Sequence, residues 1–245
     1  MKLWMFLLAS VALAQPAFDV ASVKQGGPVR PDGLLNIDLG HANNGVVTLT
    51  NTTLSEMVRY AYGLTNEDQI AGPGWIKDRQ YRYELVGKAA PDTKVETLRL
   101  MLQTLLKERF RLELHQEPRK ITHLILERGK AEPKVTPSSP DEASSRVISM
   151  PGHLQYRRIA MNTFVALISR FLKQPVLDRT GLTGVYDLKL EWTPDDAVAP
   201  TDSAPTPKPD IFTAVQQQLG LKLEVSKEPL EVLVVDKAEK VPLEN

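Results

Sequence analysis

Cysteine is absent from this chain of 245 residues, and that absence excludes several kinds of chemistry. No disulfide can hold the fold together, no thiol can act as a nucleophile, and no cysteine can carry a lipid anchor. The chain also has no excess of charge of either sign, because 30 basic residues balance 30 acidic ones and the two kinds are interspersed. Without a basic face, we predict no nucleic-acid partner.

The sequence also lacks the common catalytic and cofactor motifs. It contains no Gly-x-Ser-x-Gly, no His-Glu-x-x-His and no glycine-rich loop of the kind that binds phosphate. Histidine is scarce, with four in the chain. His115 and His123, near Glu113 and Glu117, would suggest a metal site, but we interpret both as solvated strand residues, with His115 paired to a glutamate. We therefore expect no cofactor and no bound metal.

The amino terminus carries an apolar run that is too short to span a membrane. One lysine precedes about a dozen apolar residues that end in Ala12-Leu13-Ala14, and Gln15-Pro16 closes the run. A membrane span needs roughly 20 such residues. We predict a signal peptide at 1–14, a secreted or periplasmic location, and no stable membrane insertion after cleavage.

One order of elements occurs twice in the rest of the chain. Each copy reads as strand, helix, turn, strand, helix and hairpin, and Glu117-Pro118 in the first hairpin corresponds to Glu228-Pro229 in the second. This pattern predicts an internal duplication of a unit of about 85 residues. The expected fold is α+β, with two small lobes that each pack two helices on a mixed or antiparallel sheet.

Particular elements can be assigned from local patterns. Alternating residues predict strands at 18–24, 34–39 and 46–50, the last two joined by a turn over 40–45. Thr53 and Glu56 have the spacing of a helix capping box. An apolar stripe predicts a helix over 95–110, followed by a hairpin over 111–126. A second helix and hairpin are predicted over 211–219 and 222–236.

Polar, proline-bearing stretches set the expected domain boundaries. The segment 136–145 is predicted to link a first repeat at 15–135 to a second repeat at 146–245. A proline-rich stretch at 193–210 interrupts the second repeat and reads as a surface insertion.

The turn over 178–184 is the leading candidate for a binding surface. Asp178 can accept hydrogen bonds from following backbone amides, and Gly181 and Gly184 can permit backbone reversals. Thr180 lies between them, and Trp75 occupies the glycine-rich turn of the first repeat. We expect this turn to be a structural device first and a binding surface second.

Three carboxylates offer an alternative reading. Asp178 together with Asp187 or Glu191 would suit a glycosidase if two of them faced each other across a cleft at about 5 to 10 Å. The alternative function is thus a secreted hydrolase acting on polysaccharide. Carboxylates that cap turns or point into solvent would argue against it.

Four segments together carry a resemblance to a known family: residues 18–24, 101–112, 178–187 and 218–224. They resemble a soil-associated secreted protein family, expanded in acidobacteria, whose function is unknown. The resemblance implies no established catalytic residues. Some relatives are fused to membrane metalloproteases of the beta-lactam-sensor type, which implies a sensory or partner-binding role.

The repeated unit is also similar to the short amino-terminal domain of secretins and TonB-dependent receptors, which works through protein contacts. The function expected from the sequence is accordingly that of an exported, non-catalytic protein-binding or sensory module of the cell envelope. Its expected partner is another envelope protein.

Overall fold

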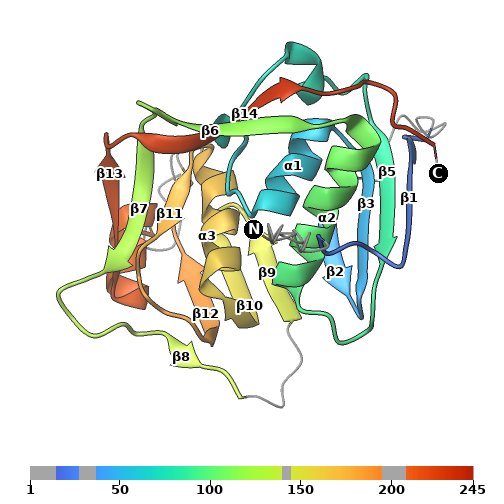
Figure 1. Ribbon diagram of the computed structural model, residues 1–245. Helices are drawn as coiled ribbons and strands as arrows, with labels where there is room; N and C mark the ends of the chain where they lie inside the picture. Colours follow the sequence, from blue (N-terminus) through green and yellow to red (C-terminus); the bar gives the residue numbers. More distant parts are fainter. Residues whose placement is uncertain (1–14, 28–36, 140–144, 195–207, 245) are drawn as a thin grey trace, which may run out of the picture. The chain divides into compact units, whose positions relative to one another are not determined.

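The computed structural model describes residues 15–27, 37–139, 145–194 and 208–244. The predicted signal peptide and most of the predicted insertion at 193–210 lie outside these ranges. The chain divides into two compact units (Figure 1). Unit 1 runs through Gly63 and also includes Gly74–Glu113 and the segment from Asp236, whereas unit 2 consists of Leu64–Pro73 and Leu114–Val235. Helices and sheets occur in both, which confirms the α+β class.

Unit 1 is built on an antiparallel four-stranded sheet with the order β1-β5-β3-β2. Its strands are β1 (Val20–Gln25), β2 (Asp38–Asn43), β3 (Val46–Thr52) and β5 (Tyr83–Lys88). Two helices accompany this sheet, α1 (Leu54–Tyr62) and α2 (Val95–Phe110), with a short helical turn η2 (Gly74–Lys77). The predicted helix over 95–110 is confirmed at both ends.

The predicted capping box begins helix α1. The Thr53 hydroxyl accepts a hydrogen bond from the Glu56 amide, and the Thr53 amide donates to Glu56 Oε2 at 2.9 Å. Glu56 is 2% exposed, and its other carboxylate oxygen binds Arg79 Nη2 at 2.5 Å. The backbone amides of Thr53 and Glu56 thus have acceptors, and the charge of the buried carboxylate is paired with that of Arg79.

The first hairpin differs from its predicted boundaries. Strand β2 includes Gly40 and His41, which were expected in the turn, so the turn shrinks to Asn44-Gly45 between the paired residues Asn43 and Val46. Both turn residues have positive φ, 48° and 74°, as a two-residue type I′ turn requires. A Cβ at Gly45 would also collide with the carbonyl oxygen of Ala90.

Unit 2 contains a second four-stranded sheet and two sheets of three strands. The four-stranded sheet has the order β8-β12-β10-β9, and the others have the orders β11-β7-β13 and β4-β14-β6. The strands are β4 (Ile70–Ala71), β6 (Glu113–Arg119), β7 (His123–Arg128), β8 (Thr136–Pro137), β9 (Ser145–Met150), β10 (His153–Ala160), β11 (Val176–Asp178), β12 (Val185–Glu191), β13 (Leu221–Ser226) and β14 (Leu230–Lys237). The terminal residues of β6 and β14 fall in unit 1. The helices are α3 (Met161–Leu172), α4 (Ile211–Ala214) with its continuation η3 (Val215–Leu219), and the turn η1 (Glu67–Gln69).

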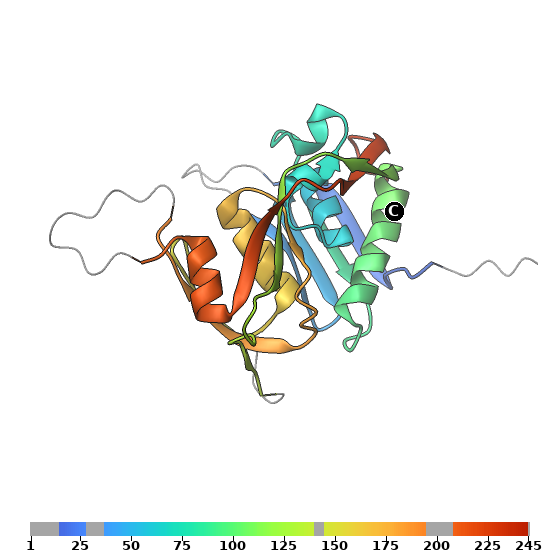
Figure 2. The same ribbon diagram turned by 90° about the vertical axis from the view of Figure 1, so that its left-hand side faces the viewer.

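The two predicted hairpins do not form. Strands β6 and β7 are consecutive, yet β7 pairs with β11 and β13 while β6 pairs with β14. Figure 2 shows β6 and β14 running side by side. The burial pattern gives the reason, because His123–Leu126 are four consecutive buried residues rather than an alternation. Such a strand is covered on both faces and takes a middle position in its sheet.

The two halves of the sequence therefore exchange their last strands within unit 2. The middle strand β14 comes from the second half but lies between β4 and β6 of the first half. The middle strand β7 comes from the first half but lies between β11 and β13 of the second half. The two four-stranded sheets correspond in their strand order. In the first, β5 and β3 lie between β1 and β2, and in the second, β12 and β10 lie between β8 and β9.

Part of the predicted linker at 136–145 is paired strand. Thr136 and Pro137 form β8 opposite Asp187 and Tyr186 on β12, and the Ser138 amide donates to the Val185 carbonyl at 3.0 Å. A proline is tolerated there because β8 is an edge strand that needs few donors. The expectation of a simple linker is wrong for these residues.

The ends of the predicted insertion are joined to each other. The Thr193 amide donates to the Pro209 carbonyl at 2.8 Å, and the Thr193 hydroxyl donates to the Lys208 carbonyl at 2.6 Å. Asp210 then caps α4 by accepting from the amides of Phe212 and Thr213. These hydrogen bonds hold the end of β12 next to the start of α4.

The exchanged arrangement predicts that truncating the middle strand β7 will destabilise the protein. Leu126 is 0% exposed, so we expect Leu126→Ala to lower the free energy of unfolding by about 2–5 kcal/mol through lost burial and a cavity. Urea unfolding followed by circular dichroism measures it. The matched control is Leu100→Ala at a residue that is 50% exposed, where we expect a change within about 0.5 kcal/mol. Equal effects of the two variants would contradict the central position of β7.

Candidate functional site

The predicted turn after β11 is held together by its own side chains. Asp178 Oδ1 accepts hydrogen bonds from the Thr180 amide at 2.9 Å and the Thr180 hydroxyl at 2.7 Å. The same hydroxyl oxygen accepts from the Leu182 amide at 3.1 Å. Thr180 is 2% exposed, so its role in these bonds leaves it little access to a ligand. This geometry is the Asx-turn expected from the sequence.

The two glycines of the turn serve different purposes. Gly181 has a φ of 67°, a conformation that L side chains rarely adopt. Gly184 is not among the positive-φ residues, so its expected role in a backbone reversal is wrong. A Cβ there would lie 3.1 Å from the Tyr186 hydroxyl oxygen, and Gly184 instead leaves space for that side chain.

Two arginines fasten the turn to neighbouring segments. Arg128 Nε donates to the Thr180 carbonyl at 2.8 Å, which ties the turn to strand β7. Arg179 Nη2 lies 3.1 Å from Glu228 Oε2, and both side chains are more than half exposed. The exposed pair contributes little stability, whereas the half-buried Arg128 contact fixes the backbone.

Asp187 is used as a hydrogen-bond acceptor. Its Oδ1 accepts from the Ser138 hydroxyl at 2.5 Å and from the Arg158 amide at 3.0 Å. The Ser138 hydrogen bond, followed by the Arg158 amide, lowers the pKa of Asp187 below its ordinary value. The carboxylate thereby connects β12 to β10 and to the segment that follows β8.

Glu191 lies among cations at the end of β12. Its carboxylate oxygens lie 3.4 Å from Lys208 Nζ, 3.5 Å from Lys189 Nζ and 3.6 Å from His153 Nε2. Burial by itself raises the pKa of Glu191, but the Lys208 hydrogen bond and the charge of Lys189 outweigh it, and the net shift is downward.

The backbone of Glu191 is fixed by an unpredicted residue, Gln218. The Gln218 side-chain amide accepts from the Glu191 N–H at 2.9 Å and donates to the Glu191 carbonyl at 2.7 Å. Gln218 thus pairs with β12 as a neighbouring strand would. Nothing in the local sequence distinguishes it from Gln216 and Gln217, since only the tertiary packing brings it to β12.

Two of the three candidate carboxylates, those of Asp187 and Glu191, lie on strand β12, and Asp178 lies on β11. Asp187 and Glu191 are four residues apart on one strand, which separates their Cα atoms by about 13 Å at 3.3 Å per residue. The pKa values of both carboxyl groups are shifted downward, whereas the acid of a glycosidase has a raised pKa. Asp178 ends β11, a strand of another sheet, and is engaged in its own turn.

Trp75 belongs to unit 1, apart from the four other predicted binding residues in unit 2. Its ring meets the Tyr81 ring edge-on at 5.9 Å. Lys240 Nζ lies 4.5 Å from the Tyr81 ring centroid and 5.9 Å from that of Trp75, and it donates to the Tyr81 hydroxyl at 3.1 Å. The carboxyl-terminal segment supplies the cation, so the chain itself occupies these aromatic faces.

The histidines follow the prediction in part. His115 Nε2 lies 3.5 Å from Glu117 Oε2, as expected for a pair with a glutamate. His123 is 1% exposed rather than solvated, and its Nδ1 donates to the Ile121 carbonyl at 2.9 Å. In the described ranges, no group of three histidine, aspartate or glutamate side chains is placed to hold a metal ion.

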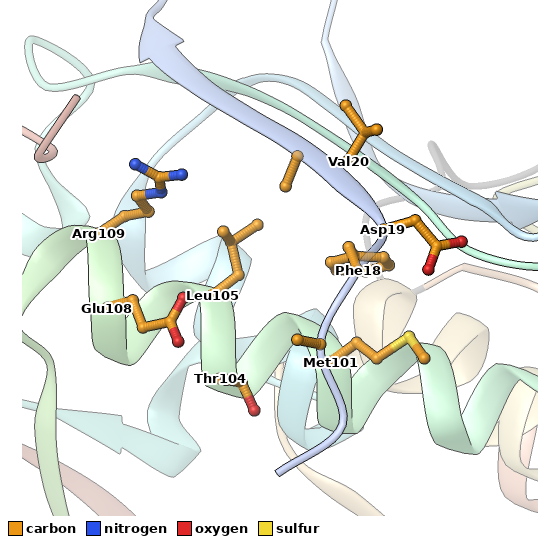
Figure 3. A pocket seen from close by; sticks show the side chains of 10 residues that line it. Phe18, Asp19, Val20, Met101, Thr104, Leu105, Glu108 and Arg109 are labelled. Atoms are coloured by element: carbon orange, nitrogen blue, oxygen red, sulfur yellow. The ribbon is translucent and has the colours of Figure 1, made fainter. Parts of the chain in front are cut away.

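A hollow of about 320 Å³ lies in unit 1 between residues 17–21 and helix α2 (Figure 3). Phe18, Met101 and Leu105 supply apolar walls, and Glu108 and Arg109 lie at one end. Gly87 makes room for Phe18, because a Cβ there would lie 2.7 Å from the ring. A second hollow, of about 530 Å³, lies between residues 22–25 and 241–244. We call the two hollows together the groove of unit 1, and none of the site residues predicted from the sequence lines it.

The signal that could have located the groove was present in the sequence. Segments 18–24 and 101–112 both carry the family resemblance, and both contribute walls of the first hollow. Their adjacency could not be inferred, because strand 18–24 was assigned no partner. The carboxyl-terminal segment lies next to both. The Leu243 amide donates to the Arg109 carbonyl at 2.7 Å, and residues 241–244 line the second hollow together with residues 22–25.

The fold and the site define an α+β protein of two units in which Asp178 and Asp187 accept hydrogen bonds from backbone amides and hydroxyl groups. In the part of the chain that the structure describes, no helix is both long and apolar enough to cross a membrane. The chain belongs to the family described as protein of unknown function (DUF3738), whose model matches residues 55–238. No curated protein and no solved structure matches the chain. The β1 segment of the groove precedes the matched region.

The hydrogen bonds of Asp178 predict a structural cost when they are removed. We expect Asp178→Ala to lower the free energy of unfolding by about 1–2 kcal/mol, because the Thr180 amide and hydroxyl lose their acceptor. Asp178→Asn keeps a carbonyl oxygen and should lose less. Urea unfolding of the full chain measures both, with Glu231→Ala as the exposed control. An Asp178→Ala variant as stable as the parent would show that the turn is not a structural device.

The lowered pKa of Asp187 predicts a pH-dependent contribution to stability. Because the folded-state pKa lies below the unfolded value, the contribution is fully present above the unfolded pKa of about 3.9. It is lost as the pH falls through the folded-state pKa. We expect Asp187→Asn to be less stable than the parent at pH 7, with the difference shrinking at pH 3. Asp92→Asn is the control, and a pH-independent difference for Asp187→Asn would contradict the prediction.

Proposed function

We propose that this protein is an exported, non-catalytic module that binds another protein of the cell envelope. The observation that carries the proposal is the groove in unit 1. Its two hollows together are lined by every residue from 17 to 25. Strand β1 is the terminal strand in the sheet order of unit 1. Terminal strands beside a groove are surfaces on which extended peptides commonly bind.

The state of the carboxylates supports a non-catalytic role. Asp178 holds a turn, Asp187 connects strands, and Glu191 is surrounded by cations. Each of these roles uses the charged form as an acceptor, whereas a glycosidase acid must hold a proton near neutral pH. The hydrolase therefore remains the second candidate, without a geometric pair to favour it.

The proposed location is secreted or periplasmic. It rests on the apolar run and small-residue site at 1–14, which precede the described residues. A sensory role, as the family resemblance implies, would use the same groove to report on a partner.

We also propose that the two halves of the chain arose from one duplicated unit. The proposal is supported by the matching positions of corresponding strands in the two four-stranded sheets and by the reciprocal exchange of β7 and β14. A crystal structure tests it: residues 38–110 and 145–219 should superpose element by element, and a different connectivity in either half would overturn it.

The binding proposal predicts a position-dependent cross-link in the native envelope. A photo-reactive phenylalanine at Glu108, at the end of the groove, should give a discrete cross-linked product. The same residue at Val225, which is 58% exposed in unit 2, is the control and should give none. Thr104→Trp, which places a bulky ring on the groove wall, should abolish the product from position 108.

Two results would overturn the proposal. Products of equal yield from positions 108 and 225, or a product insensitive to Thr104→Trp, would show that the groove is not the contact. Hydrolysis of a cell-wall or plant polysaccharide by the purified protein, lost in Asp187→Asn or Glu191→Gln, would establish the hydrolase instead.

A further inference from the structure

A separate hollow in unit 2 has the composition of a small-molecule site. It measures about 260 Å³ and lies between the carboxyl-terminal end of α3, the end of β12 and the start of α4. Phe171, Leu172, Trp192 and Ile211 give it apolar walls, and Arg170 and Lys173 also line it. The carboxylates and the groove discussed above involve none of these side chains.

The walls of this hollow are preformed. The Phe171 and Trp192 rings meet edge-on with centroids 5.7 Å apart, and Trp192 is 4% exposed. The Trp192 amide donates to the Gly152 carbonyl at 3.1 Å, and Gln218 holds the preceding residue by both of its backbone groups. Ile211 is 3% exposed and begins the helix that Asp210 caps. A ligand would therefore meet walls that need little ordering, which favours binding.

The charged residues that line the hollow, Arg170 and Lys173, are both cations. Within the described ranges, neither Arg170 nor Lys173 makes a side-chain hydrogen bond or an ion pair, and no acidic residue lines the hollow. Helix α3 carries no aspartate or glutamate. Two cations in the last turn and at the cap of a helix also suit the helix dipole, so their position has a structural benefit as well. That benefit does not account for the aromatic cavity beside them.

We propose that this hollow, the α3 pocket, binds a compact amphipathic carboxylate: an apolar or aromatic body with one carboxylate group. The body would contact the partly exposed Phe171 and Leu172, and the buried Trp192 ring would sense it through its edge contact with Phe171. The carboxylate would be held by Arg170, whose guanidinium fork matches that group, with Lys173 beside it. The volume of about 260 Å³ lies just below the roughly 300–1,000 Å³ that is typical of ligand pockets, so the ligand must be small. This site goes beyond the proposed protein-binding groove, which lies in the other unit.

The experiment uses the full chain and 4-phenylbutanoate as the probe. Its binding is followed by the NMR signal of the Trp192 indole N–H, which is assigned among the three tryptophans by comparison with Trp4→Phe and Trp75→Phe variants. We expect a saturable shift of the Trp192 signal at 1:1 stoichiometry, while the Trp75 signal stays in place. The uncharged amide, 4-phenylbutanamide, should bind at least tenfold more weakly, because it lacks the charge that the two cations recognise.

The matched variants separate binding from helix stability. Arg170→Gln/Lys173→Gln should weaken 4-phenylbutanoate binding at least tenfold, whereas Lys222→Gln/Lys227→Gln, which removes two other cations of unit 2, should leave it unchanged. No saturable shift of Trp192, equal binding of the acid and the amide, or full binding by the Arg170→Gln/Lys173→Gln variant would each overturn the proposal. The last result, with a lowered melting temperature, would assign the two cations to the helix terminus. Each readout is independent of the cross-linking at Glu108, so the two proposals can fail separately.

Discussion

Unit 2 depends on two middle strands: β7 pairs with β11 and β13, and β14 pairs with β4 and β6. Each strand lies between two strands from the other half of the sequence, so neither half can complete its sheets alone. Both are rich in buried residues, and a strand covered on both faces needs hydrogen-bonding partners on both edges. The exchange therefore makes the folding of the two halves interdependent and explains why the compact units do not follow the order of the chain.

The same need to satisfy polar groups accounts for the state of the acidic residues. Backbone amides at strand ends and at helix starts lack partners within their own element, and nearby side chains supply acceptors. Asp178 does this after β11, Asp187 beside β8 and β10, and Asp210 before α4. Carboxylates that accept these hydrogen bonds hold the chain in place.

The hollows of the two units differ in a way that follows from their construction. The groove of unit 1 is formed by a terminal strand, a helix and the carboxyl-terminal segment, and its lining carries charges of both signs. The α3 pocket is smaller, has a buried tryptophan in its wall and carries charge of one sign. These differences in lining are why we propose an extended chain as the ligand of the first and a compact anion as the ligand of the second.

Local chemistry determined what the sequence could predict. The Thr53–Glu56 cap, the helix over 95–110 and the Asx-turn at Asp178 depend on residues within a few positions of one another, and each formed as expected. Strand pairing, by contrast, depends on residues distant in the sequence, and an apolar run such as 123–126 does not specify its partners. The tertiary structure alone therefore decided that the hairpins open, that Gln218 reaches Glu191, and that β1 lies beside α2 to form the groove.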